Sequence, residues 1–224
     1  MNLTHTFAHA LMMASTAQLI LRVSFFYLSI LFTAVTQLFS DQIRRACGLS
    51  CDEKTLLFVG RFTHKKGLQK LESLARQHPT WTWLCIGDGE IRPEDWRLPN
   101  VRVLPSLPQA ELRQYYIAAD IFVLPSVGEG FPLAAQEALS CGLPVALDRS
   151  TARAFADAPI VQFDAENVEN ISTKLEDVLS DSAQIQSLRA QSVEYAKRWN
   201  WDETALRYET IFFGDSDQFQ ASLT

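Results

Sequence analysis

The chain has 224 residues, which is enough for one good α/β domain or two very small ones, and 47% of them are hydrophobic. Its formal net charge of −6 argues against nucleic-acid binding, because no basic stripe stands out beyond residues 61 to 70. The four cysteines show no metal-ligand spacing, which fits reduced thiols in a cytosolic protein better than disulfides or zinc ligands.

Residues 1–50 form an apolar N-terminal segment, whose first 35 residues contain no acidic side chain. Residues 17–36 are about long enough to cross a bilayer, although Gln18 and Arg22 interrupt them. No Lys or Arg precedes this stretch, so it makes a poor signal peptide. The overlapping stretch "ILFTAVTQLFSDQIRRACG" predicts instead a strand and a helix, as in the remnant of a preceding domain. A remnant of a first domain and a membrane anchor both stay open here.

Alternating strand and helix patterns follow, and they predict one doubly wound parallel sheet. Residues 51–214 are assigned to this domain and residues 215–224 to a polar tail, in which "DSD" is not expected to bind metal because it does not follow a strand. The expected strands are 55–60, 81–87, 101–105, 121–125, 144–148 and 159–163, and the expected helices are 66–77, 109–119, 132–141, 166–180, 183–198 and 201–212.

The first loop that carries chemistry follows the apolar strand in "LLFVG". Arg61 and Lys66 bracket the turn between this strand and the next helix, at the sheet edge where open α/β folds bind ligands. A planar guanidinium and a point charge there suit a diphosphate. The alternative is a solvated surface turn. It is fair for His64 and Lys65 but weaker for Arg61, which comes directly after a buried strand and Gly60.

The second such loop lies in "GEGFPLAAQEALSCGLPV", where Glu129 and Glu137 stand eight positions apart across the start of a helix. Pro132 suits a first helical position. The free N–H groups of residues 130–133 and the helix dipole attract an anion, most naturally a phosphate. Carboxylates repel phosphate but accept hydrogen bonds from sugar hydroxyls, so the pattern suggests a nucleotide sugar. The alternative is a solvated Glu129 and a Glu137 on the water-facing stripe of the helix.

Four motifs, "VGRF…KKG", "CIGDGE", "YYIAADIFVLPS" and "EGFPLAAQEALSCGLPVAL", occur in this order. Together they resemble the donor-binding domain of the retaining family 4 (group 1) glycosyltransferases, in which the Glu129-to-Glu137 interval is the E-x7-E signature. The resemblance covers about residues 33–214, roughly half of the usual enzyme. It implies an α/β fold: a single doubly wound Rossmann-like parallel sheet, the donor-binding half of a GT-B fold, with a helical N-terminal extension.

The resemblance also implies roles for single residues. Arg61 and Lys66 would neutralise the donor diphosphate, Glu129 would contact hydroxyls of the transferred sugar, and these three are the expected catalytic residues. Glu137 would hold the ribose hydroxyls. Members often have a glycine-rich loop after "PVALD", where this chain has "RSTARAF", so contacts from that loop cannot be carried over. The expected donor-binding residues are Gly60, Arg61, Lys66, Gly87, Glu129, Gly130, Phe131, Pro132 and Glu137.

The activity that the resemblance implies is metal-independent transfer of a hexose-type sugar, with retention, from a nucleotide-sugar donor to an unknown glycan or lipid-linked acceptor. No cofactor is expected. A partner chain that supplies the acceptor domain is one possibility, and the expected location is the cytoplasm or the cytoplasmic face of a membrane. Two other functions stay open: a non-catalytic nucleotide-sugar-binding remnant or subunit, and a nucleotide-sugar epimerase-like enzyme.

Overall fold

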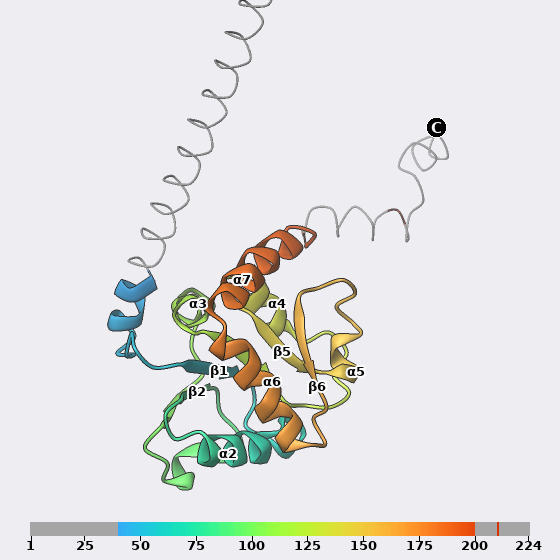
Figure 1. The fold of residues 1–224 in the computed structure, drawn as a ribbon. Coiled ribbons are helices and arrows are strands. Elements are labelled where there is room, and N and C mark those ends of the chain that lie inside the picture. The colour runs from blue at the N-terminus through green and yellow to red at the C-terminus, as the bar shows by residue number, and fades with distance from the viewer. Residues whose placement is uncertain (1–39, 200–209, 211–224) are drawn as a thin grey trace, which may run out of the picture.

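The computed structural model describes residues 40–199 and Thr210 (Figure 1). Its centre is a six-stranded sheet in the order β3-β2-β1-β4-β5-β6, with every neighbouring pair parallel. This confirms the predicted doubly wound α/β fold. The strands are β1 (Thr55–Val59), β2 (Thr82–Ile86), β3 (Val101–Leu104), β4 (Ile121–Leu124), β5 (Val145–Asp148) and β6 (Ile160–Phe163).

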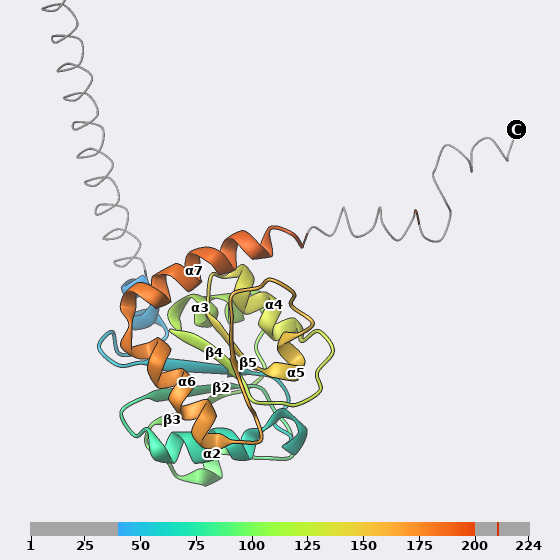
Figure 2. The ribbon, with the colours of Figure 1, turned by 45° about the vertical axis from the view of Figure 1, so that its right-hand side comes forward.

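Helices cover the sheet (Figures 1 and 2). On one face α2 contacts α6, on the other α3 contacts α4, and α7 packs against both α4 and α6. The helices are α2 (Leu68–Gln77), α3 (Gln109–Ala118), α4 (Leu133–Ser140), α5 (Arg149–Ala152), α6 (Val168–Ser180) and α7 (Ser182–Ala196), with 3-10 turns η1 (His64–Lys66) and η2 (Pro93–Trp96), and residues 40–46 are also helical.

The central strands are buried on both faces, as their continuous apolar runs predict. Every residue of β4 and β5 is buried, and so are the first four residues of β1. Val59 pairs with Ile86, and Ile86 pairs with Leu104, so β1, β2 and β3 end level with one another. Strand order reverses between the neighbours β1 and β4, and this is the switch point at which such sheets bind ligands.

The loop after β1 differs from the sequence prediction. A helix was expected from residue 66, but Lys66 ends the 3-10 turn η1 and α2 begins at Leu68. Gly67 separates the two with a left-handed φ of 80°. A Cβ at this glycine would lie 2.5 Å from the Pro125 carbonyl oxygen, so the glycine lets the β1 loop meet the β4 loop.

Two further details were not expected. Pro132 is the N-cap of α4 rather than its first helical residue, and α5 follows β5 where no helix was predicted. Within the part of the chain that the structure describes, no helix is both long enough and apolar enough to cross a bilayer. The predictions for residues 17–36 and "DSD" lie outside the described residues, and so does the helix predicted over 201–212 except for Thr210.

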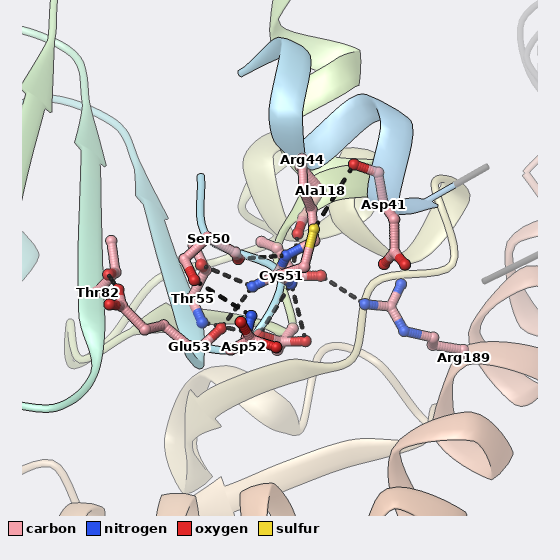
Figure 3. A network of polar contacts seen from close by, with 12 residues as sticks. Asp41, Arg44, Ser50, Cys51, Asp52, Glu53, Thr55, Thr82, Ala118 and Arg189 are labelled. Atoms are coloured by element: carbon pink, nitrogen blue, oxygen red, sulfur yellow. Dashed lines mark hydrogen bonds and ion pairs between the residues drawn. The ribbon is translucent and has the colours of Figure 1, made fainter. Parts of the chain in front are cut away.

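A buried arginine ties residues 40–49 to the sheet (Figure 3). Arg44 is only 5% exposed. Its guanidinium pairs with Asp120 at 3.1 Å and donates to the carbonyls of Ala118 at 2.9 Å and Glu53 at 2.6 Å. Thr55, the first residue of β1, donates its N–H to Asp120 at 2.7 Å. The domain boundary at residue 51 stays a prediction, although the bonds of Arg44 cross it.

Candidate functional site

The loops after β1, β2 and β3 join at the carboxyl edge of the sheet through backbone contacts. The Gly60 N–H donates to the Ile86 carbonyl at 3.1 Å, and the Gly87 N–H donates to the Leu104 carbonyl at 3.0 Å. A Cβ on Gly87, whose φ is 150°, would lie 2.0 Å from the Gly60 carbonyl oxygen. The backbones of Gly60 and Gly87, two of the predicted site residues, are therefore in direct contact, and neither residue has a side chain to separate them.

The two predicted cations differ in what they contact. The Arg61 side chain is exposed and has no hydrogen-bond or ion-pair partner among the described residues. The Lys66 ammonium lies 2.9 Å from Oε1 of Glu129, with the two side chains 21% and 14% exposed. The structure thus brings Lys66 and Glu129 together across the β1 and β4 loops and leaves Arg61 available to a ligand.

Glu129 keeps hydrogen-bonding capacity in spite of this ion pair. Its Oε1 is buried, and no donor in residues 40–199 reaches it with hydrogen-bond geometry. The 2.9 Å distance nevertheless makes the Lys66 contact an ion pair, because charge attraction tolerates a poor angle. A carboxylate oxygen has room for more than one donor, so Glu129 can accept from a hydroxyl. The alternative of a solvated loop residue is wrong for Glu129.

The first turn of α4 presents unpaired donors. No residue of the described chain accepts from the N–H groups of Gly130, Phe131 and Leu133, and Pro132 has no N–H. A Cβ on Gly130 would meet nothing within 4 Å, so space is open there. A helix start with free N–H groups and a positive dipole end attracts an anion, as the sequence predicted for this segment.

Glu137 is half-buried and held by side chains of α3. Its carboxylate accepts from the Tyr116 hydroxyl at 2.8 Å and from the Gln109 amide at 3.2 Å. Burial, and after it the Glu137 charge and hydrogen bond, raises the pKa of Tyr116, which therefore stays a neutral donor. The alternative of a water-facing Glu137 is wrong. Tyr116 lies in the quoted motif "YYIAAD", but nothing in the sequence showed that α3 packs against α4.

Residues 40–199 contain no group of three or more His, Cys, Asp or Glu side chains placed to hold a metal ion. Of the cysteines, Cys85 is fully buried, and burial together with the Glu94 charge raises the pKa of its thiol to about 12. Cys47 is also buried, whereas Cys51 is exposed. These thiols lie outside the set of residues that the loops assemble.

A doubly wound parallel sheet with helices on both faces defines an α/β domain of the Rossmann-like type, and the residues described above lie at its switch point. The family can be stated as well. The profile of the glycosyl transferases group 1 matches residues 39–199, and the chain belongs to this family.

Among similar sequences is the D-inositol 3-phosphate glycosyltransferase of Thermobispora bispora, 31% identical over 194 residues, or 75% of this chain and 45% of that protein. The putative teichuronic acid biosynthesis glycosyltransferase TuaC of Bacillus subtilis is 33% identical over 106 residues, or 47% of this chain and 27% of that protein. The chain therefore spans less than half the length of these curated relatives.

Solved structures share the fold. Sucrose-phosphate synthase from Thermosynechococcus elongatus matches with a TM-score of 0.69 and 24% identity, over 80% of this chain and 49% of that one. HepE of Anabaena, solved with UDP and glucose, matches with a TM-score of 0.62 and 18% identity, over 71% and 47% of the two chains. The chain thus corresponds in fold to about half of each of these two structures.

Proposed function

We propose that the chain is the donor-binding half of a retaining family 4 glycosyltransferase that transfers a hexose-type sugar from a nucleotide sugar. The observation that carries this proposal is the grouping at the switch point. Three features belong to loops that meet at one sheet edge: the Lys66–Glu129 ion pair and, with no partner among residues 40–199, the Arg61 side chain and the N–H groups at the start of α4. Cations and N–H groups suit a diphosphate, and the carboxylate suits a sugar hydroxyl.

In the proposed complex, Arg61 and Lys66 bind the diphosphate oxygens, and the backbone of Gly130, Phe131 and Pro132 faces the sugar and phosphates. Glu129 accepts from hydroxyls of the transferred sugar. Glu137 has one carboxylate oxygen on Tyr116 and the other on Gln109, and it still has lone pairs for the ribose hydroxyls. This arrangement would place charged groups on both sides of the bond that breaks.

The proposed reaction breaks the bond between the anomeric carbon and the diphosphate oxygen, which leaves with the electron pair. The acceptor oxygen bonds to the same face of the sugar, and its proton passes to the departing diphosphate oxygen. Arg61, Lys66 and the positive end of α4 stabilise the negative charge that develops on the departing nucleoside diphosphate. The proposal therefore includes no metal or cofactor. The acceptor, of glycan or lipid-linked type, would be held by residues outside this domain.

The test is calorimetric titration of the purified chain with a panel of nucleoside diphosphates and nucleotide sugars. Replacing Arg61 with Ala should weaken nucleoside diphosphate binding by about 1.5 to 3 kcal/mol, the range for hydrogen bonds to charged groups, or roughly tenfold to a hundredfold. Lys65→Ala is the matched control, because it removes one positive charge from an exposed neighbour. Unchanged affinity in a folded Arg61→Ala variant would remove this diphosphate site.

A further inference from the structure

The short helix α5 stands where relatives of this chain were expected to have a glycine-rich loop, and it is firmly anchored. Asp148, which is 7% exposed, caps it by accepting from the Ser150 N–H at 2.8 Å and also from the Ser150 hydroxyl. The other carboxylate oxygen of Asp148 accepts from the Ala165 N–H at 3.0 Å, in the loop after β6. The first turn of α5 is therefore fixed to two strand ends.

Two consecutive hydroxyls of α5 hold the Glu129 loop. The Gly128 N–H donates to Ser150 Oγ at 3.3 Å, and the Glu129 N–H donates to Thr151 Oγ1 at 3.3 Å. Thr151 Oγ1 in turn donates to the Ser126 carbonyl at 3.5 Å. Thr151 is fully buried and uses its hydroxyl as both donor and acceptor, so it joins the start of the loop to Glu129.

Downstream of Glu129 the loop is also held at Phe131, whose ring packs on Phe155 with centroids 4.4 Å apart and whose carbonyl accepts from the Gln136 amide at 3.2 Å. The segment before Phe131 is less constrained. A Cβ at Gly128 or at Gly130 would meet nothing within 4 Å, and two glycines give this segment wide backbone freedom. The Glu129 carboxylate contacts Lys66 at its far end, but its backbone is fixed by Thr151. A misplacement of about 1 Å at a reacting centre can cost on the order of a hundredfold in rate, so an anchor at this point matters.

We propose that Ser150 and Thr151 are positioning residues that fix the backbone of Glu129 and thereby set the affinity for the sugar part of the donor. The inference rests on the proposed function. Ser150 and Thr151 lie in the segment "RSTARAF", for which the family resemblance gave no contacts, and the proposal assigns this segment a role. The proposed diphosphate cations Arg61 and Lys66 lie in the loop after β1, and Glu137, the proposed ribose ligand, lies in α4. Loss of the two hydroxyls should therefore weaken the binding of the sugar part much more than the binding of the nucleoside diphosphate part.

Replacing Thr151 with Val keeps the shape and removes both hydrogen bonds of the hydroxyl. We expect the Kd of a nucleotide sugar to rise about tenfold, as the loss of two hydrogen bonds implies, and the Kd of the matching nucleoside diphosphate to change by less than about twofold. Thr151→Ser keeps the hydroxyl and should restore the nucleotide-sugar affinity. A folded Thr151→Val variant with an unchanged ratio of the two Kd values, or a Ser variant as impaired as Val, would overturn the proposal.

Two further measurements cover the cases in which Thr151→Val does not fold or the wild-type chain binds no ligand. If Thr151→Val does not fold, Ser150→Ala carries the test, because Ser150 is exposed. This change frees the Gly128 N–H and removes the hydroxyl bond to Asp148, which still accepts from the N–H groups of Ser150 and Ala165. If the wild-type chain binds no nucleotide sugar and no nucleoside diphosphate, the proposed function fails, and backbone hydrogen exchange tests the anchor alone. The Glu129 amide should then exchange about tenfold faster in Thr151→Val than in Thr151→Ser, and equal rates would reject the positioning role.

Discussion

Glu129 and Glu137 share a residue type but have different neighbours, and this predicts different responses to the same change. Glu129→Gln removes the negative partner of Lys66, so the ammonium becomes free for phosphate. Nucleoside diphosphate binding should be kept or strengthened, whereas binding of the full nucleotide sugar should weaken by about 1 kcal/mol. Glu137→Gln should weaken the binding of both ligands by a similar amount, because both ligands carry the ribose. Calorimetry of both variants with both ligands measures these differences.

The Tyr116→Phe variant is the control for this comparison, since it removes a donor to Glu137 without touching the carboxylate. Its effect on binding should be smaller than that of Glu137→Gln. If Glu129→Gln and Glu137→Gln weakened the binding of both ligands equally, the assignment of Glu129 to the sugar and of Glu137 to the ribose would be contradicted.

For single residues, the sequence predicted which side chains lie near one another better than it predicted which of them form an ion pair or a hydrogen bond. Because the carboxyl ends of parallel strands meet at one edge, Arg61, Lys66 and Glu129 could be placed together from the order of strands and loops alone. The ion pair of Lys66 with Glu129 could not, since it depends on how the β1 and β4 loops fold toward each other. The Tyr116 bond to Glu137 was missed for the same reason: it depends on helix packing.

At the scale of elements, Gly67 and Gly128 form a matched pair. Both have left-handed φ values, 80° and 72°, but a Cβ on Gly67 would lie 2.5 Å from Pro125 O, whereas a Cβ on Gly128 would meet nothing within 4 Å. Gly128→Ala should cost only the backbone strain, about 1 to 2 kcal/mol. Gly67→Ala should cost about 1 to 3 kcal/mol more because of the overlap. Urea unfolding measures both, and equal losses would show that the two loops are not in close contact.

The cap of α5 predicts a pH dependence. Burial alone would raise the pKa of Asp148, but hydrogen bonds from the Ser150 side chain and from the backbone of Ala165, Ser150 and Arg149 outweigh it and lower that pKa. The charged form is therefore favoured in the folded state. Its contribution to stability is complete above the unfolded pKa of about 3.9 and is lost as the pH falls from there through the lower folded pKa.

Asp148→Asn should accordingly lower the free energy of unfolding by about 1 kcal/mol at neutral pH, as neutral hydrogen bonds replace charged ones. The gap between the variant and the wild type should narrow below about pH 4, where the aspartate itself takes up a proton. Unfolding curves at pH 7 and at acid pH provide the comparison. A gap that stays constant over this range would mean that the charge of Asp148 contributes nothing to the cap.

Strands and long helices could be predicted because their apolar periodicity is local. The four residues of α5 could not, because a polar run such as "RSTA" has no such pattern and its helix is fixed by Asp148 and by contacts with the neighbouring loop. The division of the segment after β1 into η1 and α2 was missed because it depends on the approach of Gly67 to another loop.

For the whole molecule, we expect binding without efficient transfer. The proposed contacts to diphosphate and ribose all come from residues 60–137, whereas the chain spans 45% of the length of its Thermobispora relative. In the proposed function the acceptor is held by residues outside this domain, and the placement of reacting groups can contribute roughly 7 to 11 kcal/mol. The purified chain should bind donor and release little nucleoside diphosphate or glycosylated product when it is incubated with membrane extract.

Arg61→Ala is the control for that assay, because any residual product that depends on this site should fall further in the variant. Robust turnover by the purified chain, with no co-purifying protein, would contradict the expectation and show that this chain binds its acceptor unaided.

The Arg44 guanidinium also determines where the polypeptide can be shortened. The glycosyltransferase motifs begin at residue 59, yet a fragment that starts after residue 50 would lack the guanidinium that pairs with Asp120 and donates to the carbonyls of Ala118 and Glu53. Asp120 would keep only the Thr55 N–H among the hydrogen-bond donors in residues 51–199. The buried Ala118 carbonyl would be left without this donor, which costs about 1 to 3 kcal/mol, and the loss of the charged partner of Asp120 adds to it. This is a sizeable part of the stability of a small domain. A fragment for ligand screening therefore has to begin upstream of Arg44, and trypsin cleavage after this buried arginine should require the domain to open.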